Sequence, residues 1–357
     1  MQDLDDLIAS IGPLDEEAAA LATRRQMRLT KPAGSLGQLE AIAVQLAGIR
    51  GQELPIIQKK AVIIMAADHG VAAEGVSAYP AAVTPQMVHN FLAGGAAINV
   101  LARQADAEVV VVDIGVAPAL SHPRLLSRKV RAGTANMAQG PAMSREEALQ
   151  AILVGRDVLN TLADRGVDLV ATGEMGIGNT TAASALTAVL TKRPVAQVTG
   201  RGTGLDDQQL AHKIAVIERA LALNAPDAAD PLDVLAKVGG LEIAGLVGVI
   251  LAAAARRVPV VIDGFIAGSA ALVAYCLCPA VRAYLLAGHV SVEQGHQAIL
   301  TYLDLVPLLN LNLRLGEGSG AVLAMHLIEA AVRTHGEMAT FTEAGVSERS
   351  DEDTAQV

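Results

Sequence analysis

Five short apolar runs place the strongest constraint on how this chain can fold. Each run ends in polar or glycine residues and is followed by a helix-like segment, so strands and helices are expected to alternate. Strands that are apolar on both faces are typical of a parallel sheet covered by helices. The runs are residues 61–67, 108–112, 167–171, 258–262 and 284–287. We therefore predict an α/β fold built on a parallel sheet.

Polar side chains at the ends of these runs predict one functional edge of the sheet. In parallel α/β sheets the ligand binds beyond the carboxyl ends of the strands. Six side chains fall at those ends: Asp68, His69, Asp113, Glu174, Asp263 and His289. Each of them taken alone is also explained as a helix cap or a structural hydrogen-bonding group. Their shared placement is what indicates a site.

The stretch VDLVATGEMGIGNTT, residues 167–181, predicts a strand, a tight loop and a helix. Glycines such as Gly176 and Gly178 let a backbone approach a ligand closely, and the first turn of the following helix offers N–H groups to an anion. We expect a phosphate there. An ionised Glu174 would repel phosphate, so it must serve another part of the ligand, such as ribose hydroxyls. The alternative is a close-packed turn with a solvated Glu174.

Length and composition allow one large α/β domain with a smaller appendage, or two domains. The chain has 357 residues, of which 52% are hydrophobic and only 2% aromatic, so its core must consist of Ala, Val, Leu, Ile and Met. Residues 15–24 and 37–49 are amphipathic and helix-like, and no strand pattern occurs before residue 50. We expect a helical appendage there, and disorder in the polar tail, residues 343–357.

Other features argue against membrane, nucleic-acid and zinc-binding proteins. No apolar run reaches the roughly 18 residues of a membrane span, and the acidic N-terminus is unlike a signal peptide. A net charge of −10 disfavours nucleic acid as a partner. Cys276 and Cys278 are separated by one residue and have no companion metal ligands, which fits a reducing compartment and no zinc site. We expect a soluble, cytoplasmic protein.

Three glycine clusters suggest a nucleotide ligand: residues 176–178, 200–204 and 316–320. None matches a P-loop, because no lysine follows in position to reach phosphates, and none opens the first strand–helix unit as a dinucleotide fingerprint does. Lys213, on the helix-like segment after the second cluster, is a candidate phosphate partner through its charge. The alternative is a solvated helix lysine. Hydrolase and metal-enzyme motifs find no match in the sequence.

Glu317 is the sharpest candidate for catalysis. It stands between Gly316 and Gly318, so the backbone is free to place its carboxylate in a tight pocket. Apolar neighbours, Leu313 and Leu315, would raise its pKa toward the range that suits a general base. The alternative is a glutamate in the first turn of a helix, where its charge would complement the helix dipole.

Six motifs together resemble one enzyme family. They are TKPAGSLG (30–37), AADHGVAAEGVSAYP (66–80), GEMGIGNTT (173–181), KVGGLEIAGLVG (237–248), DGFIAGSAAL (263–272) and GEGSGA (316–321). In this order they are similar to the nicotinate-nucleotide:dimethylbenzimidazole phosphoribosyltransferases of cobalamin nucleotide-loop assembly, over residues 20–335. The resemblance implies a Rossmann-like parallel sheet, a small helical domain made from both chain ends, and a homodimer.

The resemblance also implies domain boundaries and site residues. The small domain would take residues 1–55 and part of 301–342, a segment that carries Glu317, and the large α/β domain would take residues 56–300. Glu317 would be the general base and Glu174 the acidic residue near the nucleotide. The nucleotide and its phosphate would contact Gly176, Ile177, Gly178, Asn179, Gly202, Lys213, Asp263, Gly264 and Ser291. The acceptor base would lie among Tyr79, Met87, Met175 and Leu315.

The implied reaction transfers 5-phosphoribose from nicotinate mononucleotide to 5,6-dimethylbenzimidazole or a related lower-ligand base. Nicotinate leaves as a neutral heterocycle and needs no general acid, whereas the benzimidazole must lose its N–H proton to a base. No metal or cofactor is implied. Some relatives carry smaller or more polar residues in place of Tyr79 and Met87, which leaves the identity of the acceptor open. Two alternatives are a dinucleotide-dependent oxidoreductase, for which the glycine-rich first turn is missing, and a non-catalytic nucleotide-binding module.

Overall fold

The chain divides into two compact units in the computed structural model, which describes residues 1–202 and 204–347. The larger unit contains Met1–Pro13 and Gln58–Met325, and the smaller contains Leu14–Ile57 and the described chain from His326 onward. These limits differ from the expected boundaries at both ends. The first thirteen residues and the segment that carries Glu317 belong to the larger unit.

The start of the chain joins the larger unit because its helix has a core-facing side. Helix α1 (Gln2–Ala9) packs against α6 (Arg145–Asp164) and α11 (Leu241–Ala255), and Leu4 is buried there. A helical pattern alone does not say which core a helix covers. This helix was therefore expected to belong with its neighbours along the chain.

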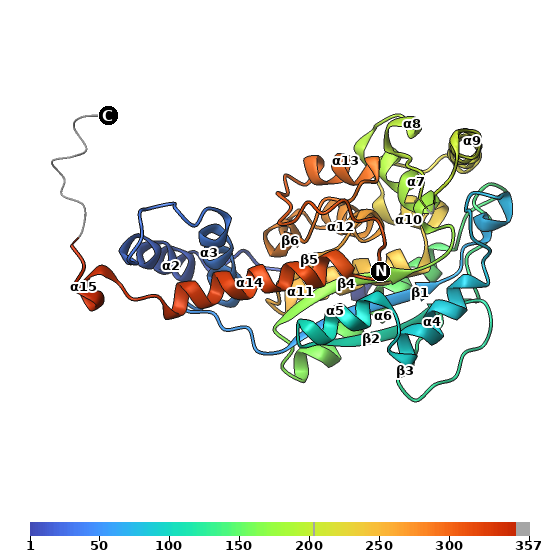
Figure 1. Ribbon diagram of the computed structural model, residues 1–357. Helices are drawn as coiled ribbons and strands as arrows, with labels where there is room; N and C mark the ends of the chain where they lie inside the picture. The colour runs from blue at the N-terminus through green and yellow to red at the C-terminus, as the bar shows by residue number, and fades with distance from the viewer. Residues whose placement is uncertain (203, 348–357) are drawn as a thin grey trace. The chain divides into compact units, whose positions relative to one another are not determined.

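A six-stranded parallel sheet forms the centre of the larger unit (Figure 1). The strands are β1 (Lys60–Ala67), β2 (Ala107–Gly115), β3 (Leu125–Ser127), β4 (Leu169–Met175), β5 (Val260–Ile262) and β6 (Leu285–Ala287). Their order, β3-β2-β1-β4-β5-β6, confirms the predicted α/β class and all five expected strands. Strand β3 was not predicted, because a strand of three residues with two exposed side chains has no distinctive apolar pattern.

The strand order places a crevice between β1 and β4. The chain proceeds from β1 to β2 on one side and from β4 to β5 on the other, and ligands of open α/β sheets bind at such a switch point. In the register, Met65 of β1 pairs with Glu174 of β4, at the carboxyl end of both strands. The sheet therefore carries Glu174 to the edge at which the sequence predicts the site.

Helices cover the sheet on both faces. Helices α4 (Val83–Ala93) and α5 (Ala97–Gln104) connect β1 to β2, and α11 precedes β5. Right-handed connections that run in opposite directions across a sheet place their helices on opposite faces. The remaining helices of this unit are the 3-10 helices η1 (Gly70–Glu74) and η2 (Pro279–Tyr284), and α7 (Asn179–Thr191), α8 (Val195–Val198), α9 (Asp207–Asn224), α10 (Pro231–Val238), α12 (Phe265–Leu277), α13 (Gln294–Tyr302) and the first part of α14 (Ser319–Glu337).

The core relies on close helix packing and not on aromatic side chains. Helix α11 is buried along almost its whole length, and it meets α6 where both helices carry glycine. A Cβ atom on Gly155 of α6 would overlap the Gly245 carbonyl oxygen, and one on Gly248 would overlap the Ile152 carbonyl oxygen. The two backbones therefore touch. Within the described residues, no helix is both long and apolar enough to cross a membrane.

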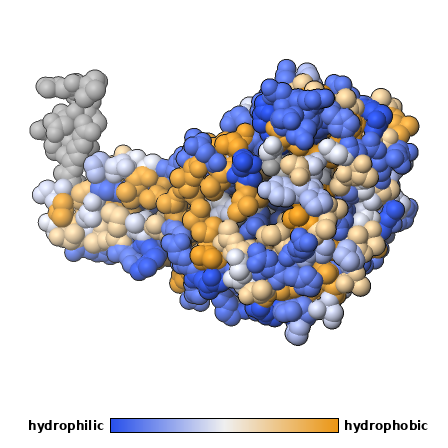
Figure 2. Space-filling view, turned by 45° about the vertical axis from the view of Figure 1, so that its right-hand side comes forward, coloured by the Kyte–Doolittle hydropathy of each residue, from blue (hydrophilic) through white to orange (hydrophobic). Residues whose placement is uncertain are grey.

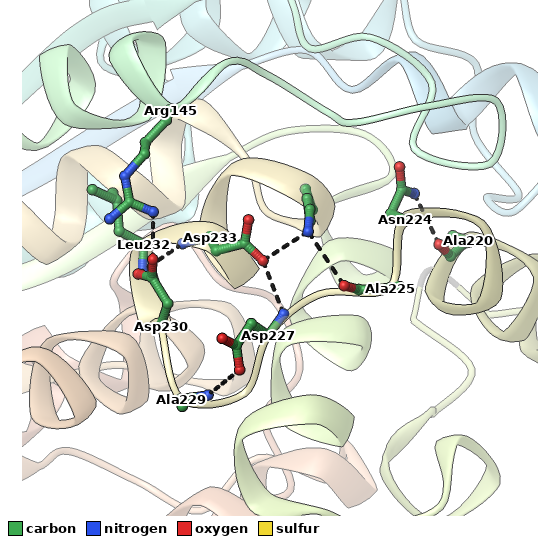
Figure 3. Close-up of polar contacts among 10 residues, drawn as sticks. Arg145, Ala220, Asn224, Ala225, Asp227, Ala229, Asp230, Leu232 and Asp233 are labelled. Carbon is green, nitrogen blue, oxygen red and sulfur yellow. Dashed lines mark hydrogen bonds and ion pairs between the residues drawn. The ribbon is translucent and has the colours of Figure 1, made fainter.

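The turn between α9 and α10 is held by carboxylates (Figure 3). Asp230 caps α10 by accepting the N–H groups of Leu232 and Asp233, and it also pairs with Arg145 at the start of α6 at 2.6 Å. Asn224 closes α9 by donating to the Ala220 carbonyl at 2.8 Å. These contacts fix the end of α9, the helix that carries Lys213.

The smaller unit is helical. It contains α2 (Glu16–Arg28), α3 (Gln38–Arg50), the end of α14 and the short α15 (Phe341–Ala344). Buried His335 joins these parts, because its Nδ1 lies 3.0 Å from Gln26 Nε2 and its Nε2 lies 2.9 Å from the Glu53 carbonyl oxygen. The first two residues of the expected disordered tail belong to α15, where Glu343 completes a capping box with Thr340. The part of that tail from residue 348 to 357 lies outside the described residues.

Candidate active site

A cavity of about 460 Å³ opens at the carboxyl edge of the sheet, within the larger unit. Twelve of the predicted site residues line it: Tyr79, Met87, Glu174, Met175, Gly176, Ile177, Asn179, Gly202, Gly264, Ser291, Leu315 and Glu317. Gly178, Lys213 and Asp263 do not. His289, which was expected at the functional edge of the sheet, also lines the cavity. The lining further contains residues to which the sequence gave no ligand contact: Val83, Thr180, Phe265, Ile266, Glu293, Arg314 and Gly316.

Glu317 is held in a rare backbone conformation. Its φ is +64°, between Gly316 at +83° and Gly318 at +91°, and a side chain at positive φ is strained unless its surroundings hold it. The carboxylate accepts the N–H of Ile98 at the start of α5, at 3.1 Å. Glu317 therefore precedes α14 but contacts the first turn of a different helix, an arrangement that the sequence alternatives did not include.

The pKa of Glu317 is raised, as expected from the sequence. Burial of the carboxylate raises it, the Ile98 N–H lowers it, and the charge of Asp263 raises it further. Burial was the expected cause, with Leu313 and Leu315 as the expected apolar neighbours, but the Leu315 side chain is 56% exposed. A carboxylate with a raised pKa binds protons more readily, which suits a general base.

The surroundings of Glu174 favour its protonated form at pH 7. Burial, together with the negative charges of Glu242 and Asp263, raises its pKa to about 8. Its Oε2 accepts a short hydrogen bond from the Asn179 side chain, and a Cβ atom on Gly316 would overlap its Oε1. The expected repulsion between this carboxylate and a phosphate therefore does not apply. A protonated Glu174 is instead a hydrogen-bond donor inside the cavity.

Asp263 is a helix cap, the alternative that the sequence left open for each polar residue of the sheet edge. It accepts the N–H groups of Gly318, Gly320 and Ala321 at 3.2, 2.7 and 2.9 Å, so it caps α14 instead of facing the cavity. His289 Nε2 lies 3.6 Å from Asp263 Oδ1. Burial lowers the pKa of His289, but this carboxylate outweighs burial and leaves the pKa raised.

The other polar residues of the sheet edge serve the scaffold. Asp68 accepts the N–H of Ala117 at 2.7 Å, and Asp113 accepts that of Val116 at 2.9 Å. His69 Nε2 lies 2.7 Å from Glu242 Oε1, with both side chains buried. These are the structural hydrogen bonds that the sequence left open as alternatives.

The glycine loop after β4 packs tightly against β1. A Cβ atom on Gly176 would lie 2.5 Å from the Ala67 carbonyl oxygen, and Gly178 has a φ of +96°. The N–H of Ile177 donates to Thr84 Oγ1 at 3.0 Å, and that of Asn179 donates to the Gly176 carbonyl at 3.1 Å. Part of the expected row of free N–H groups is therefore already bonded.

Lys213 lies behind the cavity wall and is fully buried. Its Nζ donates to Thr180 Oγ1 at 2.7 Å and would lie 3.2 Å from a Cβ atom placed on Gly202. Burial lowers its pKa to about 8, against the attraction of Glu293. The alternative of a solvated helix lysine is therefore wrong. Thr180 and Gly202 both line the cavity, so the lysine lies directly behind these two lining residues.

The cavity lining also contains a set of apolar side chains. They are Met87, Met175, Leu315, Val83, Phe265 and Ile266, together with Tyr79, which is 55% exposed. The sequence predicted four of these seven residues. In the described part of the chain, no group of three or more His, Cys, Asp or Glu side chains is arranged to hold a metal ion.

The parallel sheet, with two carboxylates of raised pKa in a cavity at its carboxyl edge, defines an α/β enzyme. The chain belongs to the phosphoribosyltransferase family, whose model matches residues 11–346. The nicotinate-nucleotide–dimethylbenzimidazole phosphoribosyltransferase of Chloroflexus aggregans is 66% identical over 349 residues, which cover 98% of this chain and 99% of the relative. The enzyme of the same name from Desulforudis audaxviator is 59% identical over 342 residues, which cover 96% of this chain and 97% of the relative.

A solved structure agrees with these relatives. The crystal structure of CobT from Thermus thermophilus is 50% identical in sequence and superposes with a TM-score of 0.90. The match covers 93% of this chain and all of that one. The family resemblance stated from the six motifs is therefore confirmed.

Proposed function

We propose that this chain transfers 5-phosphoribose from nicotinate mononucleotide to 5,6-dimethylbenzimidazole or a related lower-ligand base. The products are α-ribazole 5′-phosphate and nicotinate. The observation that carries the proposal is a single cavity whose lining combines Glu317, polar groups backed by the buried cation Lys213, and a set of apolar side chains. This combination matches a substrate pair made of a sugar phosphate and a flat aromatic base.

Glu317 is proposed to take the proton of the incoming base. In nicotinate mononucleotide the ring nitrogen carries the positive charge of a pyridinium, so the C1′–N bond breaks to release nicotinate with an uncharged ring, and no general acid is needed. The benzimidazole nitrogen that forms the new bond must have its electron pair free, and its partner N–H proton passes to the Glu317 carboxylate. Hydrogen bonding to Ile98 and the constrained backbone hold that carboxylate in place.

The polar side is proposed to bind the 5′-phosphate. Lys213 supplies the charge, with Thr180, Gly202 and Ser291 as the nearest hydrogen-bonding groups on the lining. Protonated Glu174, beside Asn179, is proposed to donate a hydrogen bond to a ribose hydroxyl. Asp263 contributes indirectly by fixing the loop that carries Glu317.

The direct test is product formation. The purified protein is incubated with nicotinate mononucleotide, with and without 5,6-dimethylbenzimidazole, and nicotinate and α-ribazole 5′-phosphate are separated by chromatography. We expect both products in equal amounts and only when both substrates are present. Release of nicotinate without the benzimidazole product, or no release at all, would contradict the proposal.

We also propose that the protein is a cytoplasmic homodimer. Several large apolar side chains are exposed on the larger unit, among them Tyr79, Val292, Val306, Leu311 and Leu315. On the face shown in Figure 2, hydrophobic areas, in orange, alternate with hydrophilic ones, in blue. A surface of this kind favours association with another protein chain. Both cysteines are free thiols, which suits a reducing compartment. Light scattering after size exclusion tests the dimer, which should have twice the chain mass of 36.7 kDa.

A further inference from the structure

Glu293 places a buried carboxylate on the polar side of the cavity. It is only 7% exposed and lines the cavity directly. Its Oε1 accepts the Gly202 N–H at 3.0 Å, whereas its Oε2 is buried with no hydrogen-bond partner among the described residues. Glu293 also stands at the N-cap position of α13, but its side chain does not cap that helix. The carboxylate therefore points toward the backbone of Gly200 and Gly202, in the second glycine cluster.

The backbone of Gly200 and Gly202 lies close to both this carboxylate and the buried lysine. A Cβ atom on Gly200 would overlap Glu293 Oε2, while one on Gly202 would lie 3.0 Å from Thr180 Oγ1 and 3.2 Å from Lys213 Nζ. Glu293 and Lys213 therefore flank the same short backbone segment. A phosphate that reaches Lys213 and the Gly202 N–H must enter the immediate neighbourhood of Glu293.

The surrounding charges do not compensate two anions. The cations around this segment include Lys213 on α9, Arg201, which is exposed and paired with Asp207, and Arg314, which is exposed and whose Nη1 donates to the Gly202 carbonyl at 3.2 Å. His289 is paired with Asp263. Burial, together with the charge of His289, lowers the pKa of His296 on α13 to about 3, so His296 is neutral. Glu317, on the same lining, adds negative charge when it is ionised.

We infer that phosphate binding in this cavity is coupled to the uptake of one proton by Glu293, an inference that rests on the proposed phosphate side. A phosphate oxygen replaces the carboxylate as acceptor of the Gly202 N–H. The proton comes from solvent, and the resulting carboxylic acid donates its O–H to a phosphate oxygen. Two anions that share one site are stabilised when one of them is protonated, because their repulsion is replaced by a hydrogen bond. Glu293 is then a substrate-binding residue that acts as a proton acceptor.

Calorimetry at about pH 7 isolates this proton. A phosphate monoester has its second pKa at about 6, so it is almost wholly dianionic there, and Lys213, with a pKa of about 8, is almost wholly charged. Nicotinate mononucleotide is titrated in buffers of different ionisation enthalpy, which gives the number of protons taken up. For the wild type we expect about one proton, and for Glu293→Gln about none, with binding retained. Glu218→Gln, an exposed glutamate on α9, is the matched control and should match the wild type.

A second measurement does not depend on the variant. As pH rises from about 6.5 to 7.5, the wild-type Kd should weaken about tenfold per pH unit, as one coupled proton requires. A wild-type uptake near zero overturns the inference, as does full uptake in Glu293→Gln or the loss of all binding in that variant. Ribose 5-phosphate is titrated in parallel. If it binds with proton uptake while nicotinate mononucleotide does not bind, the proposed function fails and the inference stands. If neither binds, both fail.

Discussion

Glu317 and Glu174 have the same chemistry but differ in their surroundings. Both are buried and have a raised pKa, but a backbone N–H lowers the pKa of Glu317 against burial, whereas the negative charges of Glu242 and Asp263 raise that of Glu174 further. Two carboxyl groups whose pKa values are set by different environments can serve as a base and as a hydrogen-bond donor in one cavity. The functional assignment therefore depends on the surroundings of each residue.

Replacing Glu317 by glutamine should separate catalysis from binding. We expect kcat to fall about 100-fold or more, the usual loss for a positioned general base, with the Kd of nicotinate mononucleotide nearly unchanged. Steady-state rates and calorimetry on the same sample measure both. The kcat of the wild type at saturating substrates should also rise with pH as Glu317 loses its proton, and the variant should lack this rise. Near-full kcat in the variant would exclude Glu317 as the base.

Replacing Glu174 by glutamine should stabilise the protein, and more so at higher pH. The folded pKa is raised to about 8 from 4.5, so the stability from this group is complete below pH 4.5 and is lost as pH rises toward 8. Glutamine has no proton to lose and can still accept the Asn179 hydrogen bond. We expect the Tm difference between variant and wild type to grow to about 5 °C from pH 5 to pH 8. A constant difference would show that Glu174 is not protonated.

Helices α6 and α11 pack through direct backbone contact at glycines, without large side chains between them. Their backbones approach so closely at Gly155 and Gly248 that neither position has room for a methyl group. This contact supports the face of the sheet that α11 covers, and it lets a chain with few aromatic residues bury its strands. The position of Glu174 at the end of β4 depends on that support.

A Gly248→Ala substitution should therefore be destabilising, although alanine is the better helix former. The new methyl group would overlap the Ile152 carbonyl oxygen, and overpacking of this kind costs about 1–3 kcal/mol. Gly336→Ala is the matched control, because Gly336 lies in α14 with nothing within 4 Å of its Cβ position. That change should stabilise by about 0.5–1 kcal/mol through helix propensity alone. Chemical denaturation of both variants measures the contrast, and equal effects would refute the packing argument.

The whole larger unit is needed to assemble the cavity. The polar side takes Thr180 from α7, Gly202 from the loop after α8, and Ser291 from the segment after β6, while Lys213 stands behind it on α9. Because the ligand contacts segments that are far apart in sequence, its binding should stabilise the unit as a whole. At a ligand concentration of about 100 times Kd the gain is about 2.7 kcal/mol.

The stabilisation by nicotinate mononucleotide should decline steeply above pH 8. Lys213 binds phosphate in its charged form, and its pKa of about 8 means that this charge is lost as pH rises further. Thermal shifts at fixed ligand concentration should shrink between pH 8 and pH 9 for the wild type. Lys213→Arg should keep a larger share of the shift, because arginine stays charged. Lys192→Arg, at an exposed lysine after α7, is the control and should behave as the wild type. The same decline in Lys213→Arg would assign the effect to another group.

Sequence by itself determined the elements and most of the cavity lining. Apolar runs are local signals, and parallel strands bring their carboxyl ends to one edge, so the pattern alone was enough to place residues such as Glu174 and Gly264. The motifs around Glu317 and Gly176 then identified the family. A three-residue strand such as β3 carries too little pattern to be found in this way.

Only the tertiary structure decided the orientation and charge of the side chains. In the folded chain Asp263 caps α14, and burial among other carboxylates raises the pKa of Glu174 to about 8. Lys213 is buried, and Glu293 accepts the Gly202 N–H. Burial and charge–charge interactions depend on which distant segments pack together, and the spacing of residues along a chain does not encode those distances. For the same reason the sequence pattern of α1 did not show that this helix packs in the core of the larger unit, against α6 and α11.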